Sequence, residues 1–265
     1  HKIKKTPKGV LFYFVPSEYV TRVTYVRNRI GGSRELLERS EYSCDRKRNR
    51  GSCRKLRIEP LYESPFQVYY IPMEPVLDSN LSTEEALLQN PLSLAPEDII
   101  NQQTLLDVTY YGFDGQMHQG QIVVNKLVAD DVIDFFKEAV RTQFPIQKVI
   151  PIADKHYQWN DDISCADNNS SGFNYRTIAG TDRLSNHATG CAFDINPVQN
   201  PYIRWKDGVE TYRVPVGSTY EKDAPGTLHE DHPLVILLTS RGWTWGGNWI
   251  HEGNVVDYQH FEYKQ

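Results

Sequence analysis

Residues 185–194, with the sequence SNHATGCAFD, constrain this chain more than any other stretch. They place a histidine, a glycine, a small residue and an aspartate in that order, and Asn196 and Pro197 follow closely. A surface loop has no need of this pattern, and a buried strand does not normally contain His and Asp, because unpaired polar groups are costly to bury. The pattern therefore indicates a metal site.

The local geometry that we expect supports this interpretation. If residues 191–195 form a strand, successive side chains face opposite sides, so the hydrophobic residues face the core while Asp194 faces away from it. Gly190 permits a bend that brings His187 back beside Asp194, and the small Ala192 leaves room for an ion. One imidazole and one carboxylate make half of a zinc site, so a further ligand is needed.

The C-terminal segment offers the third ligand. His260 lies in a short Val-, Tyr- and Phe-rich stretch that predicts a strand, and Asp257 precedes it by three residues. In a regular strand Asp257 would point away from His260, so its carboxylate must come from a bend or loop before the strand. Two His, one Asp and an open position for water would suit hydrolysis, with a nearby carboxylate as the base. Taken singly, a histidine in a strand is more often a structural residue.

Two other patterns fail as metal sites. The sequence HEDH at residues 229–232 would need a histidine at position 233 to form the H-E-x-x-H helix of metalloproteases, and the chain has Pro233 there. His251 and Glu252 likewise lack a second histidine at position 255. The cysteines contain no close C-x2-C pair, which excludes a zinc ribbon.

The four cysteines are compatible with two disulfides. Cys44 and Cys53 flank a polar loop that could close on itself, and Cys165 and Cys191 lie near the suspected site. The first pair lies in a segment too polar to bury thiols, so we expect oxidising conditions and both disulfides. The alternative is four reduced thiols.

The motifs together identify a family resemblance. SNHATGCAFDINP, GWTWGGNW and DYQHFE resemble the zinc peptidases of the D-alanyl-D-alanine carboxypeptidase family, which includes vancomycin-resistance dipeptidases and phage L-alanyl-D-glutamate endolysins. The resemblance covers about residues 100–263. The family pattern is S-x-H-x-x-G-x-A-x-D, followed by an acidic residue three positions before a histidine. The matching positions are Ser185, His187, Gly190, Ala192, Asp194, Asp257 and His260.

The resemblance implies roles for the metal-binding and catalytic positions, and for Arg176, which matches the family's basic residue ahead of the histidine motif. One zinc ion per chain would be bound by His187, Asp194 and His260, and Asp257 would be the general base. Arg176 would bind a substrate carbonyl or carboxylate and stabilise the oxyanion, because its guanidinium is always charged.

Arg176, Ser185 and a group of three tryptophans each have a structural interpretation as well. Arg176 could form a structural salt bridge. Ser185 would contact the substrate or orient the turn before His187. The tryptophans at positions 243, 245 and 249 are expected to form core and the wall of a cleft.

The expected fold is α+β, with a small, mostly antiparallel sheet and flanking helices around a single zinc site, plus an N-terminal β-rich extension. We expect residues 1–95 to form a basic extension or accessory region and residues 96–265 the zinc peptidase domain. The sequence pattern predicts strands within residues 10–30 and 65–77, a short capped helix opening at 82–88 and followed by a linker, a hairpin over 105–125, and helices over 124–144 and 233–241.

Charge is distributed unevenly along the chain. Residues 1–57 hold 16 Lys or Arg against 5 Asp or Glu, a net charge of +11, so the rest of the chain carries −16 of the total of −5. The basic region predicts contact with an anionic cell-wall surface or with the acidic remainder. No nucleic-acid motif accompanies it, and no apolar run approaches the length of a membrane span, about 18 residues. Because the chain opens with His1, we expect that a preceding segment was removed.

The resemblance implies hydrolysis of peptidoglycan stem peptides in the bacterial periplasm or outside the cell. Two bonds remain open: the terminal D-Ala-D-Ala bond of a carboxypeptidase, and the L-Ala-D-Glu bond of an endopeptidase. The rival from another class is a non-catalytic, zinc-containing cell-wall or protein-binding module of the same fold. The presence of both Asp257 and Arg176 argues against that rival, because a structural site needs neither.

Overall fold

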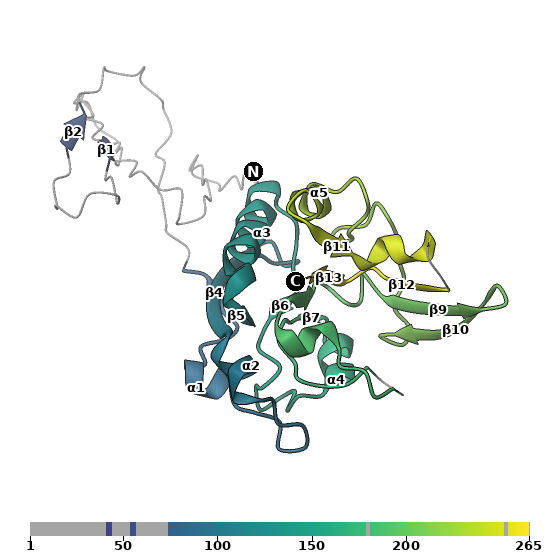
Figure 1. Cartoon of the computed structure of the whole chain (residues 1–265). Helices are drawn as coiled ribbons and strands as arrows, with labels where there is room; N and C mark the ends of the chain where they lie inside the picture. The colour runs from purple at the N-terminus through teal and green to yellow at the C-terminus, as the bar shows by residue number, and fades with distance from the viewer. Residues whose placement is uncertain (1–40, 44–53, 57–73, 179–180, 252–253, 265) are drawn as a thin grey trace. The chain divides into compact units, whose positions relative to one another are not determined.

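A computed structural model describes the chain over most of its C-terminal two thirds (Figure 1). The chain divides into two compact units, residues 1–74 and 75–265. In the first unit the described residues form one antiparallel pair, β1 (Glu41–Ser43) and β2 (Arg54–Leu56). The strands expected within 10–30 and the Cys44–Cys53 disulfide lie outside the described residues, which are 41–43, 54–56, 74–178, 181–251 and 254–264.

The second unit contains the expected hairpin. Strands β4 (Gln103–Tyr111) and β5 (Met117–Asn125) pair antiparallel along their whole length. The turn between them uses Gly115 at a φ of 78°, a conformation that favours glycine. The short strand β3 (Val76–Leu77) adds to β5 in parallel. The prediction of a hairpin is therefore confirmed.

Both long helical patterns are confirmed. Helix α3 (Ala129–Thr142) follows a 3₁₀ turn, η2 (Lys126–Val128), and ends where Gln143 adopts a left-handed conformation ahead of Pro145. Helix α5 (Pro233–Thr239) begins with proline at its first turn, where the missing N–H costs nothing. In Figure 1, α3 lies beside the β4–β5 hairpin. The buried stripe of α3 consists of Val132, Phe135, Phe136 and Ala139.

A three-stranded antiparallel sheet carries the residues of greatest chemical interest. Its strand order is β11 (Trp243–Trp245), β13 (His260–Tyr263) and β8 (Ala192–Asp194). Phe193 and Phe261 lie opposite each other, stacked at 5.4 Å between ring centroids and packed against Phe135 of α3. As the alternation of a strand predicts, Cys191, Phe193 and Ile195 are all buried in this core.

The remaining described elements form smaller sheets. Strands β9 (Tyr202–Lys206), β10 (Val209–Val214) and β12 (Val255–Asp257) make an antiparallel sheet whose β9–β10 hairpin extends outward in Figure 1. The parallel pair β6 (Lys148–Val149) and β7 (Asn169–Ser170) lies beside helix α4 (Asp161–Ala166). The mixed α+β prediction is confirmed, although the single sheet is replaced by several small ones. Among the residues described, no helix is long and apolar enough to cross a bilayer.

The segment ahead of the hairpin is more ordered than we expected. Helix α1 (Thr83–Ala86) has the predicted cap, in which Ser82 accepts from the N–H of Glu85 and the Glu85 carboxylate accepts from the N–H of Ser82. The expected linker after it contains a second helix, α2 (Glu97–Asn101). The accessory role of residues 1–95 stays a prediction.

The prediction of a disulfide between Cys165 and Cys191 is wrong. Both cysteines are buried, and the two sulfurs are not joined. Cys191 packs in the core behind β8, whereas Cys165 lies on α4 with its thiol 3.9 Å from the side-chain oxygen of Gln259. The two side chains therefore pack in different layers of the fold. Their closeness to the same motif in the sequence gives no sign of this.

Candidate metal centre

The register of β8 and β13 brings the first two candidate ligands together. His260 and Asp194 are directly opposite each other across the antiparallel pair, on the face away from the aromatic core. Cross-strand neighbours of this kind lie about 5 Å apart at Cβ, close enough for side-chain contact. The Nδ1 atom of His260 lies 3.0 Å from Oδ1 of Asp194. Both side chains are buried.

The third candidate ligand comes from a short 3₁₀ helix, η3 (Asn186–Thr189), immediately before β8. Ser185 caps this helix by accepting a hydrogen bond from the N–H of His187. Gly190 ends it at a φ of 72°, and a Cβ there would overlap the side-chain oxygen of Gln103, so the position requires glycine. The turn places Nε2 of His187 3.2 Å from Oδ2 of Asp194.

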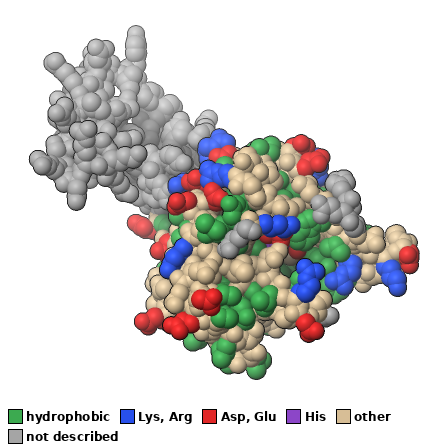
Figure 2. Space-filling view, viewed as in Figure 1, with side chains coloured by type: hydrophobic (Ala, Val, Ile, Leu, Met, Phe, Trp, Pro, Cys, Tyr) green, Lys and Arg blue, Asp and Glu red, His purple; other side chains and the backbone are tan. Residues whose placement is uncertain are grey.

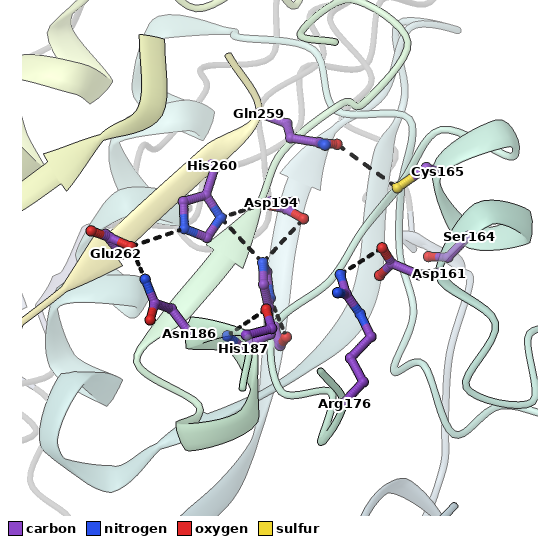
Figure 3. A network of polar contacts seen from close by, with 12 residues as sticks. Asp161, Ser164, Cys165, Arg176, Asn186, His187, Asp194, Gln259, His260 and Glu262 are labelled. Atoms are coloured by element: carbon purple, nitrogen blue, oxygen red, sulfur yellow. Dashed lines mark hydrogen bonds and ion pairs between the residues drawn. The ribbon is translucent and has the colours of Figure 1, made fainter. Parts of the chain in front are cut away.

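The hydrogen bond on the far side of the His187 ring fixes its tautomer. Nδ1 lies 2.7 Å from the carbonyl oxygen of Gly172, so Nδ1 carries the proton and the lone pair of Nε2 faces Asp194 and His260 (Figure 3). A Cβ on Gly172 would overlap the Val123 carbonyl, so the close approach of Gly172 to the backbone of β5 requires glycine. The structure thus brings together ligand atoms of His187, Asp194 and His260 that all lie within 4.8 Å of one another.

Glu262 is a member of the site that the sequence analysis missed. Its Oε2 lies 3.4 Å from Nε2 of His260, and the same carboxylate accepts hydrogen bonds from Asn186 and from the Lys264 ammonium, 3.2 Å away. Burial opposes its ionisation, but the hydrogen bonds and charges of His260 and Lys264 together outweigh burial and lower the pKa of Glu262 to about 2. Its position two residues after His260 in a strand, and therefore on the same face, was the signal available in the sequence.

The donor set fits a zinc ion. Zinc in catalytic sites takes imidazole nitrogens and carboxylate oxygens, and the ligating histidines hydrogen-bond a carbonyl or carboxylate through their other nitrogen. His187 and His260 both have such a partner, in Gly172 and Glu262 respectively. Burial opposes the ionisation of Asp194, but the two histidines outweigh burial and hold its pKa well below the ordinary value. The group could therefore hold a metal with an anionic oxygen and two oriented nitrogens.

Asp257 lies at the end of β12, and a turn at Tyr258 and Gln259 separates it from His260. The expected bend before the His260 strand is therefore present, although Asp257 belongs to a strand of a different sheet. Its Oδ1 atom is buried and has no hydrogen-bond partner among the described residues. Burial raises the pKa of Asp257 to about 7, Asp194 adds to the rise and His260 opposes it. A carboxyl group with a pKa near neutrality suits proton transfer.

Arg176 reaches the same region from the segment after Gly172, which belongs to no helix or strand. Its guanidinium donates to Oδ2 of Asp161 at the start of α4, at 2.6 Å, while its Nε is buried and lacks a partner within the described part of the chain. The ion pair that we considered as a structural alternative is thus present. Burial opposes the charge on Arg176, but the Asp161 carboxylate, with a smaller contribution from Asp194, outweighs burial and raises the pKa of Arg176. Substrate contacts of Arg176 and Ser185 stay predictions.

The tryptophans divide as expected between core and site. Trp243 and Trp245 are buried in the core, where Trp243 contacts Phe193 edge to face. Trp249, in the 3₁₀ helix η4 (Gly246–His251), lies with its ring 5.4 Å from that of His260. Trp249 therefore forms a wall beside the candidate metal ligands.

The comparisons with known proteins bear on the C-terminal third of the chain. Residues 179–263 match the family model described as D-alanyl-D-alanine carboxypeptidase. No match was found among curated proteins or solved structures. The matched segment contains His187, Asp194, Asp257 and His260, whereas Arg176 lies just ahead of it. The resemblance drawn from the motifs is confirmed over residues 179–263, which match the D-alanyl-D-alanine carboxypeptidase family of zinc peptidases, whereas its extension to residues 100–178 stays a prediction.

Proposed function

We propose that this protein is a zinc metallopeptidase that hydrolyses peptide bonds in the stem peptides of bacterial peptidoglycan. The observation that carries the proposal is the convergence of three buried ligand atoms, from His187, Asp194 and His260, beside a carboxyl group with a raised pKa. We assign one zinc ion per chain to the three ligands. We assign the roles of base and substrate contact to Asp257 and Arg176.

The residues around the ligands supply what amide hydrolysis requires. A bound zinc ion would polarise the scissile carbonyl and lower the pKa of a water molecule. Asp257 accepts the proton that water loses as its oxygen adds to the carbonyl carbon. When the C–N bond breaks, the same proton passes from Asp257 to the leaving amine nitrogen, so the base is regenerated. Arg176 holds the carbonyl or carboxylate oxygen of the substrate, where negative charge develops.

The alternative is a zinc-containing binding module that does not turn over substrate. The environment of Asp257 favours the enzyme, since a buried carboxyl group whose oxygen has no partner among the described residues costs folding free energy. A structural zinc site gains nothing from it. The two candidate bonds, terminal D-Ala-D-Ala and L-Ala-D-Glu, place the same demands on the residues described above, so the choice between them is left to the assay.

The test is mass spectrometry of muropeptides digested with the zinc-loaded protein. Release of D-alanine identifies a carboxypeptidase, and a new N-terminal D-glutamate identifies an endopeptidase. Arg176→Lys should lower turnover, since an ammonium cannot reproduce a forked guanidinium contact, whereas the exposed Arg183→Lys should not. If the wild type releases neither product yet binds zinc and sediments with cell walls, the binding module replaces the peptidase.

This function implies a location in the periplasm or outside the cell, where the stem peptides are. The basic residues 1–57, with a net charge of +11, would then contact anionic polymers of the cell wall. Such binding should weaken steeply between low and high salt, because exposed charges are screened beyond about 8 Å at physiological ionic strength. Cosedimentation with purified walls at two salt concentrations measures this, and salt-independent binding would contradict it.

A further inference from the structure

The sheet formed by β9, β10 and β12 has one buried face and one face that carries half-buried and exposed residues. Ile203 and Val256 are partners across β9 and β12, and they are only 4% and 0% exposed, so their face lies against the core. Alternate residues of a strand point to opposite faces. Tyr202, which is half-buried, and Arg204, which is exposed, therefore lie on the other face.

Strand register places Asp257, the candidate base, on this same face. Asp257 is directly opposite Tyr202, and Val255 is directly opposite Arg204. Partners across an antiparallel pair share a face, with Cβ atoms about 5 Å apart. Successive positions on one face of a strand are about 7 Å apart. The face therefore runs from the candidate base past Tyr202 to Arg204 and outward along the hairpin.

Two tyrosines hold the guanidinium of Arg204. Its Nη2 and Nε donate to the hydroxyl oxygen of Tyr202 at 2.9 Å and 3.3 Å. Its Cζ lies 5.7 Å from the centre of the Tyr202 ring and 5.5 Å from that of Tyr212, which is opposite Arg204 on β10. A side chain that is fixed in advance loses less entropy on binding. The guanidinium is thus preorganised on this face.

The positive charge of Arg204 has no carboxylate partner within the described part of the chain. The neighbouring Glu210 is paired with Arg213, at 2.5 Å. Lys206, the next residue on the face of Arg204, is exposed as well, and in Figure 2 Lys and Arg side chains are spread along this hairpin. A forked guanidinium without a counter-ion matches the geometry of a carboxylate, to which it can donate two parallel hydrogen bonds.

The arrangement favours a carboxylate over a sugar ring. A sugar binds to aromatic residues by lying flat on an open ring face. The rings of Tyr202 and Tyr212 are T-shaped to each other, with centroids 6.0 Å apart, and Arg204 lies over both of them. The guanidinium therefore takes up ring surface that a sugar would need.

The proposed substrates supply such a carboxylate on the residue that follows the scissile bond. In D-Ala-D-Ala that residue is the C-terminal one. In L-Ala-D-Glu it is a glutamate, which has two carboxyl groups and uses only one of them to continue the chain. Close to the metal ligands, this carboxylate would meet the negative charges of Asp194 and Asp257. The charge of Arg176 is already paired with that of Asp161, at 2.6 Å.

We propose that Arg204 binds the free carboxylate of the residue that follows the scissile bond, the residue whose amine leaves. Tyr202 and Tyr212 position the guanidinium for this contact, and Arg176 is left to hold the uncharged carbonyl oxygen. This inference rests on the proposed peptidase function and adds the group that recognises the leaving residue.

The test is an NMR titration of the full-length, zinc-loaded protein, followed at the Nε–H of Arg204 and at the rings of Tyr202 and Tyr212. The probe is D-alanine, which carries the amine and the carboxylate of either leaving residue. Its control is D-alaninamide, which lacks the carboxylate. We expect the wild type to bind D-alanine about fivefold more tightly than the amide, the upper value for an exposed ion pair, and the preference to shrink at high salt.

Three variants assign the preference to one residue. Arg204→Gln should abolish it, and Arg204→Lys should keep part of it, because an ammonium keeps the charge but not the forked contact. Lys206→Gln is the matched control, since Lys206 is exposed on the same face of the same strand, and it should keep the whole preference. An equal loss in Lys206→Gln would mean that the general charge of the hairpin attracts the carboxylate, which overturns the inference.

The other outcomes separate this site from the peptidase. No preference in the wild type, or a preference that survives Arg204→Gln, overturns the inference even if muropeptides are cleaved. A response of the tyrosine rings to an N-acetylglucosamine trimer, without one to D-alanine, overturns it in favour of a sugar-binding surface. Carboxylate binding that depends on Arg204, in a protein that cleaves no muropeptide, leaves the site standing and overturns the proposed function. With both intact, Arg204→Gln should raise KM for muropeptides about fivefold with little change in kcat, because the lost contact is made outside the reacting bond.

Discussion

The candidate site has two halves: a ligand half, formed by His187, Asp194, His260 and Glu262, and a substrate half, formed by the residues expected to contact substrate or water. The halves differ in how many of their polar atoms have a hydrogen-bond partner within the chain. In the ligand half, both nitrogens of each histidine have polar neighbours, and Glu262 is hydrogen-bonded in turn. In the substrate half, which comprises Arg176 and Asp257, one buried polar atom of each residue has no partner among the described residues. The ligand half is organised before anything binds, whereas the substrate half presents groups that a ligand can satisfy.

The difference follows from the way each half is built. His260 and Asp194 are fixed by strand register, and His187 is fixed by a capped turn and a hydrogen bond to the backbone. Arg176 lies instead on a segment that has no strand longer than a single bridge, and Asp257 lies at the end of the three-residue strand β12 in a different sheet. A site with one rigid side and one side open to ligand contacts fits an enzyme better than a closed structural zinc site.

The largest expected effect comes from breaking the ligand half. His187→Ala and His260→Ala should each lose most of the one zinc ion per chain and all measurable peptidase activity, because two remaining ligands hold zinc poorly. Metal analysis of the purified variants measures this. The control is His156→Ala, whose side chain is 65% exposed and lies far from the ligands in the sequence. Full zinc retention in both ligand variants would refute the metal assignment.

The next effect tests the substrate half alone. Asp257→Asn should keep the zinc and the fold, since an amide replaces an acid at nearly equal volume, while kcat falls by about 10²–10⁴-fold because a positioned base is lost. Asp231→Asn, at a carboxylate whose side chain is 75% exposed, should change neither quantity. Equal activity of Asp257→Asn and the wild type would show that another group takes the proton.

The ligand half could be predicted well from the sequence, because the patterns that position its residues are local and periodic. The alternation of a strand placed Cys191 and Phe193 in the core and Asp194 on the opposite face, and the structure agrees. The glycine before the strand marked the turn that returns His187 to the site. Patterns of this kind depend only on neighbours within a few residues.

The segment ahead of the hairpin and the positions of the cysteines were predicted less well, because they depend on contacts between residues far apart in the sequence. The segment around Leu88, for example, is tied to a loop some 70 residues later by the hydrogen bond from Trp159. The error over Cys165 and Cys191 has the same origin, because the sequence shows that both are near the motif but not that they enter different layers.

A third prediction concerns Glu262, which supports the ligand half from behind. Glu262→Gln should weaken zinc binding by about 10–100-fold, because a neutral amide is a poorer acceptor for the N–H of His260 and no longer favours the ligating tautomer. Competition with a chelator gives the zinc affinity, and kcat at saturating zinc should change much less. A loss of kcat with unchanged zinc affinity would place Glu262 in the chemistry and not behind the ligand.

The smallest expected effect is on stability, and it opposes the effect on activity. In the zinc-free protein, burial raises the pKa of Asp257 to about 7, above the ordinary value of about 4 for an unfolded chain. Between these two values the folded state binds more protons than the unfolded state, so this group makes the free energy of unfolding decrease as pH rises from about 4 to about 7. Asp257→Asn removes this dependence.

The variant should therefore be more stable than the wild type at pH 8, by about 2 kcal/mol after allowing for the partial exposure of the side chain, and the difference should disappear near pH 4. Urea unfolding of both zinc-free proteins across this range measures it. The exposed Asp231→Asn should show no such trend. If Asp257 is the base, its ionised carboxylate should lower the stability of the folded protein, and its removal should lower activity. A wild type at least as stable as Asp257→Asn at pH 8 would instead mean that Asp257 is paired within the chain, and the contrast between the two halves would not hold at this residue.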